Sequence, residues 1–384
     1  MMFVKKFPRN VRLTIDPYEQ CPCGSQKSFK FCCKPRSIQH KHNWKEYHKY
    51  PEKRKEYESI KSWNDTAFEI CLAFDHEECK GDIKNAHSIQ KNRILNRISQ
   101  DGHLYQFIPD HVESIILAKF DRISINKAST FQGFCDFHDN KLFHPIEASD
   151  YFNEARQNFL FSFRPLALEY HKKVRDLTFR MNIFDRRPDL TINEAFVYDY
   201  RTAQLNKREY KREYEAFKKD YIEKNFNNIR TFFLKLDFEV NFATSAAFSV
   251  QFDMNGKQIN ENQMLSEIQE IKLIYVTIYP LENSTNIILS YHLRNDKTYN
   301  GLFEQLENAA QTEILKYLNQ LVIDGTENIF FSQSFIENLK EVEKDSLLKS
   351  FQASLKPLLA KKLYEENNDY RFDLFTIQSI DRDN

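Results

Sequence analysis

The chain is poor in glycine and lacks any long apolar run. Only seven of its 384 residues are Gly, and no stretch approaches the roughly 18 consecutive apolar residues that a membrane-spanning helix requires. Residues 1–10 carry lysines with no apolar segment behind them, which is not the pattern of a secretory signal. We therefore expect a cytoplasmic protein with no membrane partner, in which paired cysteines bind metal more often than they form disulfides.

Well-known catalytic signatures are also missing from most of the chain. Residues 139–384 contain no cysteine, no phosphate-binding glycine loop, no dinucleotide fingerprint and no Gly-x-Ser-x-Gly motif. The chemistry that the sequence can name is therefore confined to the first 139 residues, where all seven cysteines lie.

Charge is balanced but unevenly distributed. Lys plus Arg and Asp plus Glu both number 55, yet residues 1–64 hold fifteen basic and six acidic side chains. This surplus of nine positive charges forms a basic N-terminal arm, and the rest of the chain is correspondingly acidic. A basic arm indicates a polyanionic partner such as DNA or RNA.

Four cysteines form a first cluster within thirteen residues: Cys21, Cys23, Cys32 and Cys33. The intervening Gly24-Ser25 turn can direct the first pair toward the second. So many thiols in a short polar segment predict a tetrathiolate zinc site, which would fold a segment too short to build its own core.

A second, discontinuous cluster is formed by Cys71, Cys79, Cys135 and His138, the last two spaced as Cys-x-x-His. His87 lies between the two halves of this cluster. Two zinc-ligand sets are possible. Either Cys71, Cys79, Cys135 and His138 bind the ion, or His87 replaces Cys71, which then becomes a buried core thiol. Tetrahedral zinc accepts either set, and spacing does not choose between them.

Beyond residue 150 the pattern predicts helices and strands in separate runs. The expected helices cover residues 159–177, 195–230, 302–321 and 335–362, and the expected strands cover residues 232–242, 246–253, 271–279 and 286–293. Such an order predicts an α+β fold with an antiparallel sheet. We divide the chain into a zinc module (1–40), a basic linker helix (41–64), a second zinc domain (65–150) and an α+β domain of unknown role (151–384).

The first cluster resembles the SEC-C motif of bacterial proteins. The resemblance rests on Cys21-Pro-Cys-Gly-Ser-Gln-Lys27 followed by Phe29-Lys-Phe-Cys32-Cys33. It implies a zinc module that provides an adhesive surface for a protein partner and performs no chemistry. The segments 85–90 and 128–139 also resemble uncharacterised bacterial SEC-C proteins, a resemblance that implies no particular activity.

The second cluster resembles HNH-type endonucleases, which have a treble-clef zinc fold. The resemblance rests on the cysteine pairs, on Asn85-Ala-His87-Ser-Ile and on Cys135-Asp-Phe-His138-Asp139. It implies that Cys71, Cys79, Cys135 and His138 hold a structural zinc, that His87 is the general base, and that Asp139 binds a catalytic Mg²⁺ or Mn²⁺.

Two functions follow from these patterns. The first is a zinc protein that binds nucleic acid and cleaves phosphodiester bonds, of the kind found in bacterial defence or mobile elements. The alternative is a non-catalytic, zinc-stapled interaction protein whose C-terminal domain binds a protein partner or ligand. If the site is catalytic, His103, His144 and Glu147 are further candidates because they lie near the second cluster in sequence.

Overall fold

The computed structural model describes residues 12–39, 61, 63–66, 68–112, 115–260, 270–354 and 372–375. The chain forms two compact units, each assembled from segments that are distant in sequence. Unit 1 comprises residues 1–69, 170–215 and 262–271, and unit 2 comprises residues 70–169, 216–261 and 272–384. Most of the predicted linker 41–64 lies outside the described residues.

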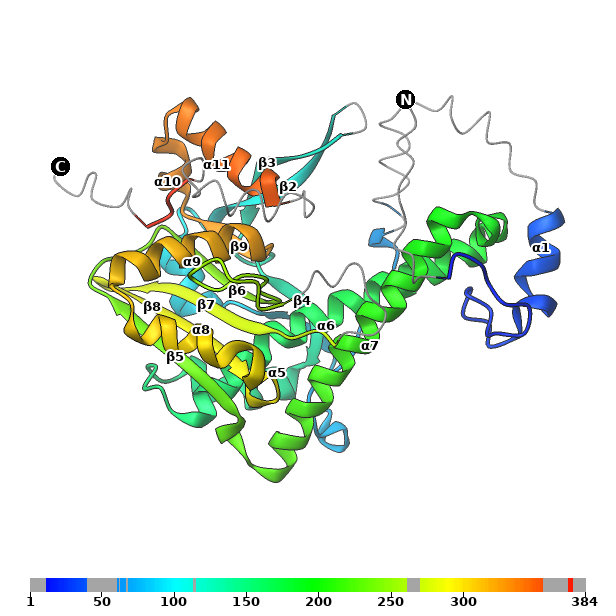
Figure 1. Cartoon of the computed structure of the whole chain (residues 1–384), viewed down its shortest axis with the longest axis horizontal. Coiled ribbons are helices and arrows are strands. Elements are labelled where there is room, and N and C mark those ends of the chain that lie inside the picture. The colour runs from blue at the N-terminus through cyan, green and yellow to red at the C-terminus, as the bar shows by residue number, and fades with distance from the viewer. Residues whose placement is uncertain are drawn as a thin grey trace. The chain divides into compact units, whose positions relative to one another are not determined.

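In unit 1 the four-cysteine segment packs on two long helices. The segment ends in α1 (Cys33–Gln39), and the helices are the C-terminal part of α6 (Ala155–Arg186) and the N-terminal part of α7 (Glu194–Glu223), joined through a 3-10 turn at Pro188–Ile192 (Figure 1). The shared core contains Ile15, Cys21, Phe29, Cys33, Leu177, Phe184, Leu190, Val197, Tyr200 and Ala203. The sequence predicts that the four-cysteine segment lacks a hydrophobic core of its own, and the two helices supply one.

Polar contacts add to this core. Arg36 on α1 forms an ion pair with Asp185 at 3.1 Å and also donates a 2.7 Å hydrogen bond to the Asp185 carbonyl. Arg201 on α7 forms an ion pair with Glu19 at 2.5 Å. Gly24 has a φ of +78°, and a Cβ there would lie 2.6 Å from the Met181 methyl group. The left-handed backbone conformation favours glycine at this turn, whereas the flexible Met181 side chain could move to make room for a Cβ.

Unit 2 is built on a seven-stranded antiparallel sheet in the order β3-β2-β9-β6-β7-β8-β5. Its strands are β2 (His103–Val112), β3 (Ile115–Ser124), β5 (Ile229–Leu236), β6 (Phe242–Phe248), β7 (Ile274–Leu281), β8 (Ser284–His292) and β9 (Ile329–Phe331). The prediction of an α+β fold with antiparallel sheets is confirmed.

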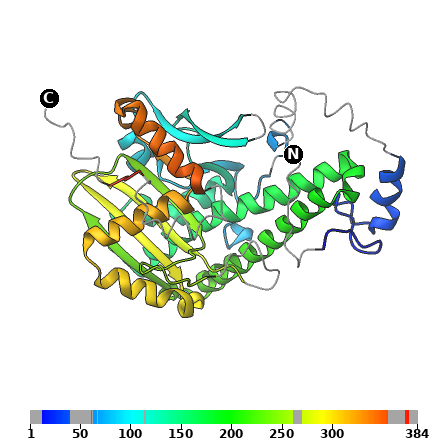
Figure 2. The same cartoon turned by 45° about the horizontal axis from the view of Figure 1, so that its top comes forward.

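Both faces of this sheet are covered. On β7, the alternate residues Ile274, Val276 and Ile278 belong to the main core cluster, together with Tyr299, Leu302, Phe303 and Leu306 of α8 (Asp296–Asn308). The i, i+3, i+4, i+7 spacing of these α8 residues presents one apolar stripe to the sheet. Figure 2 shows α8 and α9 (Gln311–Gly325) lying across this face. The intervening β7 residues face the other side, where Tyr279 stacks on Phe161 of α6 at 6.0 Å.

The second sheet of unit 2 is a two-stranded antiparallel pair followed by a helix. β1 (Ile83–His87) pairs with β4 (Thr130–Cys135), in a register that places Ile83 opposite Cys135 and His87 opposite Thr130. α5 (Asp136–Glu147) begins directly after β4. The sequence between β1 and β4 contains β2 and β3, which pair into the larger sheet.

Several predicted boundaries differ from the structure for local reasons. The helix expected at 302–321 is interrupted, because the Glu313 side chain accepts a hydrogen bond from the Ala310 N–H and begins α9. The helix expected at 195–230 ends at Glu223, where Lys224 adopts a left-handed φ of +56°. The helix expected after residue 335 is divided into α10 (Gln333–Asn338) and α11 (Glu341–Ser354) within the described residues.

Removal of the Phe184 ring tests whether the α6 and α7 helices support the four-cysteine segment. Phe184 is 1 % exposed, and its ring meets Tyr200 edge to face at 5.5 Å. Phe184→Ala should lower the free energy of unfolding by about 3–5 kcal/mol because it leaves a cavity. Denaturant unfolding measures this, with Phe31→Ala as the control. Phe31 is 69 % exposed, so its loss should change stability by less than about 0.5 kcal/mol. Equal losses for the two variants would contradict the described packing.

Candidate metal centres

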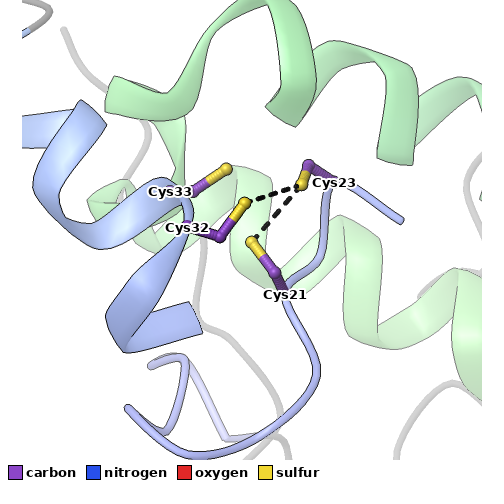
Figure 3. Close-up of side chains that lie close together, drawn as sticks. All are labelled: Cys21, Cys23, Cys32 and Cys33. Atoms are coloured by element: carbon purple, nitrogen blue, oxygen red, sulfur yellow. Dashed lines mark hydrogen bonds between the residues drawn. The ribbon is translucent and has the colours of Figure 1, made fainter. Parts of the chain in front are cut away.

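The first cluster gathers four sulfur atoms within 4.8 Å of one another. The Cys23 Sγ lies 3.4 Å from that of Cys21 and 3.5 Å from that of Cys32. Figure 3 shows the four side chains converging, with Cys33 at the start of α1. Bonds of about 2.3 Å at tetrahedral angles would place two sulfurs about 3.8 Å apart. These two distances are slightly shorter than the tetrahedral value, and all four sulfurs lie within 4.8 Å, so the cluster could hold a tetrahedral ion after small adjustments.

The environment of the first cluster differs from one thiol to the next. Burial raises the pKa of the Cys21 thiol to about 11 and raises that of Cys33 further. Burial also acts to raise the pKa of Cys32, but hydrogen bonds from Ser25 and Cys23 outweigh it and lower that pKa to about 7. Because a bound cation stabilises thiolates, metal binding would release protons from the buried pair.

The second cluster is assembled from the strands and loops around α5. The backbone N–H groups of Ile70 and Leu72 donate to the carbonyls of Gln132 and Gly133, so Cys71 is held alongside β4. Cys79 follows the short turn His76–Glu78. Cys135 ends β4 and precedes α5, which places His138 in the first turn of the helix.

One nitrogen atom lies at the centre of this second group. His138 Nδ1 is 3.4 Å from the sulfur of Cys71, 3.5 Å from that of Cys79 and 3.2 Å from that of Cys135. A tetrahedral ion with the bond lengths of zinc would separate nitrogen and sulfur by about 3.6 Å. All four ligand atoms lie within 4.8 Å of one another. The structure thus brings together Cys71, Cys79, Cys135 and His138 as one group that could hold a metal ion.

Burial disfavours charge on most of these ligands without a cation. It raises the pKa of the Cys71 thiol, raises that of Cys79 to about 12, and lowers that of His138. Burial also raises the pKa of Cys135, but backbone hydrogen bonds from His138 and Lys80 outweigh it and lower that pKa overall. A neutral imidazole and three thiols that lose protons on binding suit a soft divalent ion.

His87 lies outside this ligand group, at the end of β1. Its Nε2 is 3.0 Å from the Ile125 carbonyl oxygen, which can only accept a hydrogen bond. Nε2 therefore carries the proton, and Nδ1 presents a lone pair. Burial lowers the pKa of His87, and the positive charges of Arg164 and Lys91 lower it further, whereas Glu147 raises it. The imidazole is thus neutral at pH 7.

Asp139 follows His138 on the inward side of α5. Its Oδ1 atom is buried and has no hydrogen-bond partner. Burial raises the pKa of this carboxyl to about 6; Arg164 opposes the increase, and Glu147 and Asp136 add to it. A buried carboxylate oxygen without a partner is the kind of group that binds a cation.

An ion pair that sequence reasoning missed links the surroundings of His87 and Asp139. Arg164 of α6 is 6 % exposed, pairs with Glu147, and lies 4.5 Å over the Phe143 ring. Its Nε is buried without a partner. Arg164 and Glu147 both act on the pKa values of His87 and Asp139. The sequence contains a signal for this residue, because Arg164 is the one charged side chain in the largely apolar stretch Phe159–Leu166.

Arg164 also lines a small enclosed cavity of about 30 Å³. Other polar lining groups include Ser88, Gln90, Arg93, Ser245 and Thr277. Ser88 directly follows His87, and its hydroxyl lies 2.5 Å from that of Ser129. The space suffices for about two water molecules.

The other candidate residues occupy different positions. His103 begins β2 of the large sheet, and its Nδ1 is 2.8 Å from the Asp101 carbonyl oxygen. His144 is exposed on α5. Glu147 ends α5, and it alone of these three contributes to the Arg164 environment.

No protein-family model, curated protein or solved structure matches this chain. In the part of the chain that the structure describes, no helix combines the length and the apolar character needed to cross a membrane.

Metal content distinguishes the two ligand sets that spacing leaves open. We expect two ions per chain in the wild type and in His87→Ala, and one ion per chain in Cys71→Ser, because Cys71 and not His87 belongs to the group around His138 Nδ1. Mass spectrometry of the native protein or elemental analysis measures this directly. Loss of one ion from His87→Ala with two retained in Cys71→Ser would instead support the set that contains His87.

Proposed function

We propose that this chain is a zinc protein that acts on nucleic acid, in which β1, β4 and α5 form an HNH-like treble-clef unit that hydrolyses phosphodiester bonds. Soft ligands support zinc at both clusters, since one offers four thiols and the other three thiols and an imidazole. A reducing compartment such as the bacterial cytoplasm suits seven cysteines that form no disulfide.

The observation that carries the proposal is the position of His87 outside a complete ligand set. Four other side chains satisfy a tetrahedral ion, so the imidazole is available for chemistry. Its Nε2–H bond to the Ile125 carbonyl holds the ring, and Nδ1 can accept a proton from water. That water attacks the phosphorus atom, and the bond from phosphorus to the leaving oxygen breaks.

Asp139 would hold the second metal ion of this reaction. Its unpartnered Oδ1 fits a hard divalent cation such as Mg²⁺ or Mn²⁺. When bound, such an ion stabilises the negative charge that develops on the leaving oxygen. The charges of Arg164 and Glu147 both act on the Asp139 carboxyl, Arg164 lowering its pKa and Glu147 raising it.

A second candidate function is a non-catalytic, zinc-stapled module that binds a partner. Ala86, which precedes His87, is 2 % exposed and offers no ligand atom. Near His87, Asp139 offers one unpartnered carboxylate to a catalytic ion. Hard cations usually take several oxygen ligands, which favours the non-catalytic alternative. Under this alternative the two metal sites stabilise surfaces, one on each unit, and no cleavage occurs.

Divalent-dependent nicking of a supercoiled plasmid and of a labelled RNA separates the two functions. The wild type with Mg²⁺ or Mn²⁺ should cleave at least one of them, and His87→Ala should reduce the rate about 100-fold or more, the contribution of a general base. Asp139→Asn should also reduce the rate while both zinc ions remain bound.

His103→Ala is the matched control for His87→Ala. Like His87, His103 lies on a strand and has one ring nitrogen close to a backbone carbonyl, but it belongs to the large sheet. Its removal should leave the cleavage rate within about twofold of wild type. Equal cleavage by wild type and His87→Ala, or no cleavage by either, would remove the catalytic proposal and favour the partner-binding alternative.

The pH dependence of cleavage should reflect the environment of His87. The base must be neutral, and burial lowers its folded-state pKa below the ordinary value of 6.5. Cleavage should therefore persist through pH 6.5 and decline at more acidic pH, as the imidazole gains a proton and as the Asp139 carboxyl, whose pKa burial raises to about 6, gains one too. Single-turnover rates between pH 5 and 8 measure this, with metal content followed in parallel. An acidic inflection above pH 6.5 would contradict this role for His87.

A further inference from the structure

An open groove of about 810 Å³ lies on the outward side of α5, next to the second metal cluster. We call it the basic groove. Its lining residues are Lys80, Gly81, Asp136, Phe137, Asn140, Lys141, His144, Pro145 and Arg156. All of them belong to unit 2. The side chains of α5 in this groove follow the i, i+3, i+4, i+7 spacing of one helix face, opposite the buried Leu142, Phe143 and Ile146.

The groove carries an excess of positive charge. Lys80, Lys141 and Arg156 are exposed. Asp136 is the one carboxylate in the lining, and Glu78 forms an ion pair with Lys141. Phosphate groups can replace Glu78 as the partner of Lys141, because this ion pair is exposed and therefore weak.

The ammonium groups of two lysines lie over one aromatic ring. The Phe137 ring centroid is 5.4 Å from the Lys80 ammonium and 5.0 Å from the Lys141 ammonium. Bases stack on aromatic rings while neighbouring cations contact the phosphates on either side, so a base on the half-buried Phe137 ring requires the two ammonium groups to turn from the ring to the phosphates. This combination is typical of surfaces that bind unpaired nucleotides.

Backbone contacts hold the groove together next to the second metal cluster. Phe137 is one residue away from His138, and its backbone N–H donates to the Lys80 carbonyl at 3.4 Å. A Cβ at Gly81 would lie 3.3 Å from that of Asp136, so the loop that carries Lys80 packs closely against the start of α5. A surface held in this way loses little conformational entropy when it binds a ligand.

We infer that the basic groove binds single-stranded nucleic acid, with a base on Phe137 and the flanking phosphates on Lys80, Lys141 and Arg156. This inference rests on the proposed function and specifies its substrate as an unpaired strand. The groove lies on the outward side of α5 and Asp139 on the inward side, so a strand in the groove would be held beside the cleavage site and not within it.

The test measures binding of a fluorescein-labelled 12-nucleotide single strand, as DNA and as RNA, by fluorescence anisotropy. Every protein carries His87→Ala, so that cleavage does not consume the probe. The test variant adds Lys80→Gln, Lys141→Gln and Arg156→Gln. The matched control adds Lys235→Gln, Lys297→Gln and Lys316→Gln, three exposed lysines on β5, α8 and α9. Both triple variants keep the basic N-terminal arm.

We expect the groove variant to bind at least about tenfold more weakly at 0.1 M salt, and the control within twofold of its parent. The slope of log affinity against log salt should fall by about 2 in the groove variant, since each lost phosphate contact on a single strand contributes roughly 0.7. Phe137→Leu should weaken binding about tenfold with little change in that slope, because stacking is not an ionic contact.

Zinc content of two ions per chain verifies that each variant is folded. If the triple groove variant fails this criterion, Lys80→Gln and Arg156→Gln are measured singly. Equal weakening of the groove and control variants would overturn the inference, because charge alone would then explain binding. Tighter binding of a 12-base-pair duplex, together with no effect of Phe137→Leu, would also overturn it.

This outcome is independent of cleavage. A groove that binds as expected in a protein that never cleaves would support the inference and refute the nuclease. Cleavage that depends on His87, with binding that does not depend on the groove, would support the nuclease and refute the inference about the groove.

Discussion

The small sheet and α5 of unit 2 depend on one constraint, which is the convergence of the side chains of Cys71, Cys79, Cys135 and His138. Three sulfur atoms surround one imidazole nitrogen at 3.2–3.5 Å, and burial disfavours the thiolate form of Cys71 and Cys79. Gathering these ligands is favourable when a cation balances the negative charge of the thiolates. Metal binding and local folding would therefore be one coupled equilibrium. β1 and β4 form a two-stranded pair, which alone is marginally stable. Both the face that carries His87 and the outward groove on α5 are thus held by the same four ligands.

The first cluster would depend on a metal ion to a smaller degree, because it also has a hydrophobic core. Cys21 and Cys33 are buried among Leu177, Phe184 and Val197, which come from α6 and α7. Arg36 and Arg201 add contacts to the same two helices. The SEC-C-like motif of this chain is therefore packed into a helical unit. Its exposed residues, such as Tyr18 and Phe31, are the part that remains available to a partner.

Short-range patterns in the sequence predict a good part of this structure, and long-range pairing predicts little of it. Helices α6 and α7 and strands β7 and β8 follow from periodicity, and the second metal group is one of the two ligand sets that Cys and His spacing allows. The sequence does not show that β2 and β3 leave the region of the second metal cluster to join the large sheet, or that β9, three residues long, pairs between β2 and β6. It also left the choice between Cys71 and His87 open, because both are reachable by a tetrahedral ion. Backbone hydrogen bonds from Ile70 and Leu72 to β4 bring Cys71 to the ligand group. These hydrogen bonds involve no side chain, so no sequence motif indicates them.

The position of β9 has a consequence for synthesis on the ribosome. Tyr105 of β2 and Phe242 of β6 both pair with Phe331 of β9, so the two halves of the sheet have no common strand until that residue has left the exit tunnel. During most of translation the β2–β3 hairpin and the β5–β8 sheet each present an unpaired edge. Exposed edges of this kind are sites of aggregation in nascent chains. The order of the strands therefore makes a segment that is translated after β2, β3 and β5–β8 the one that closes the sheet, and a truncation before Ile329 would leave both edges open.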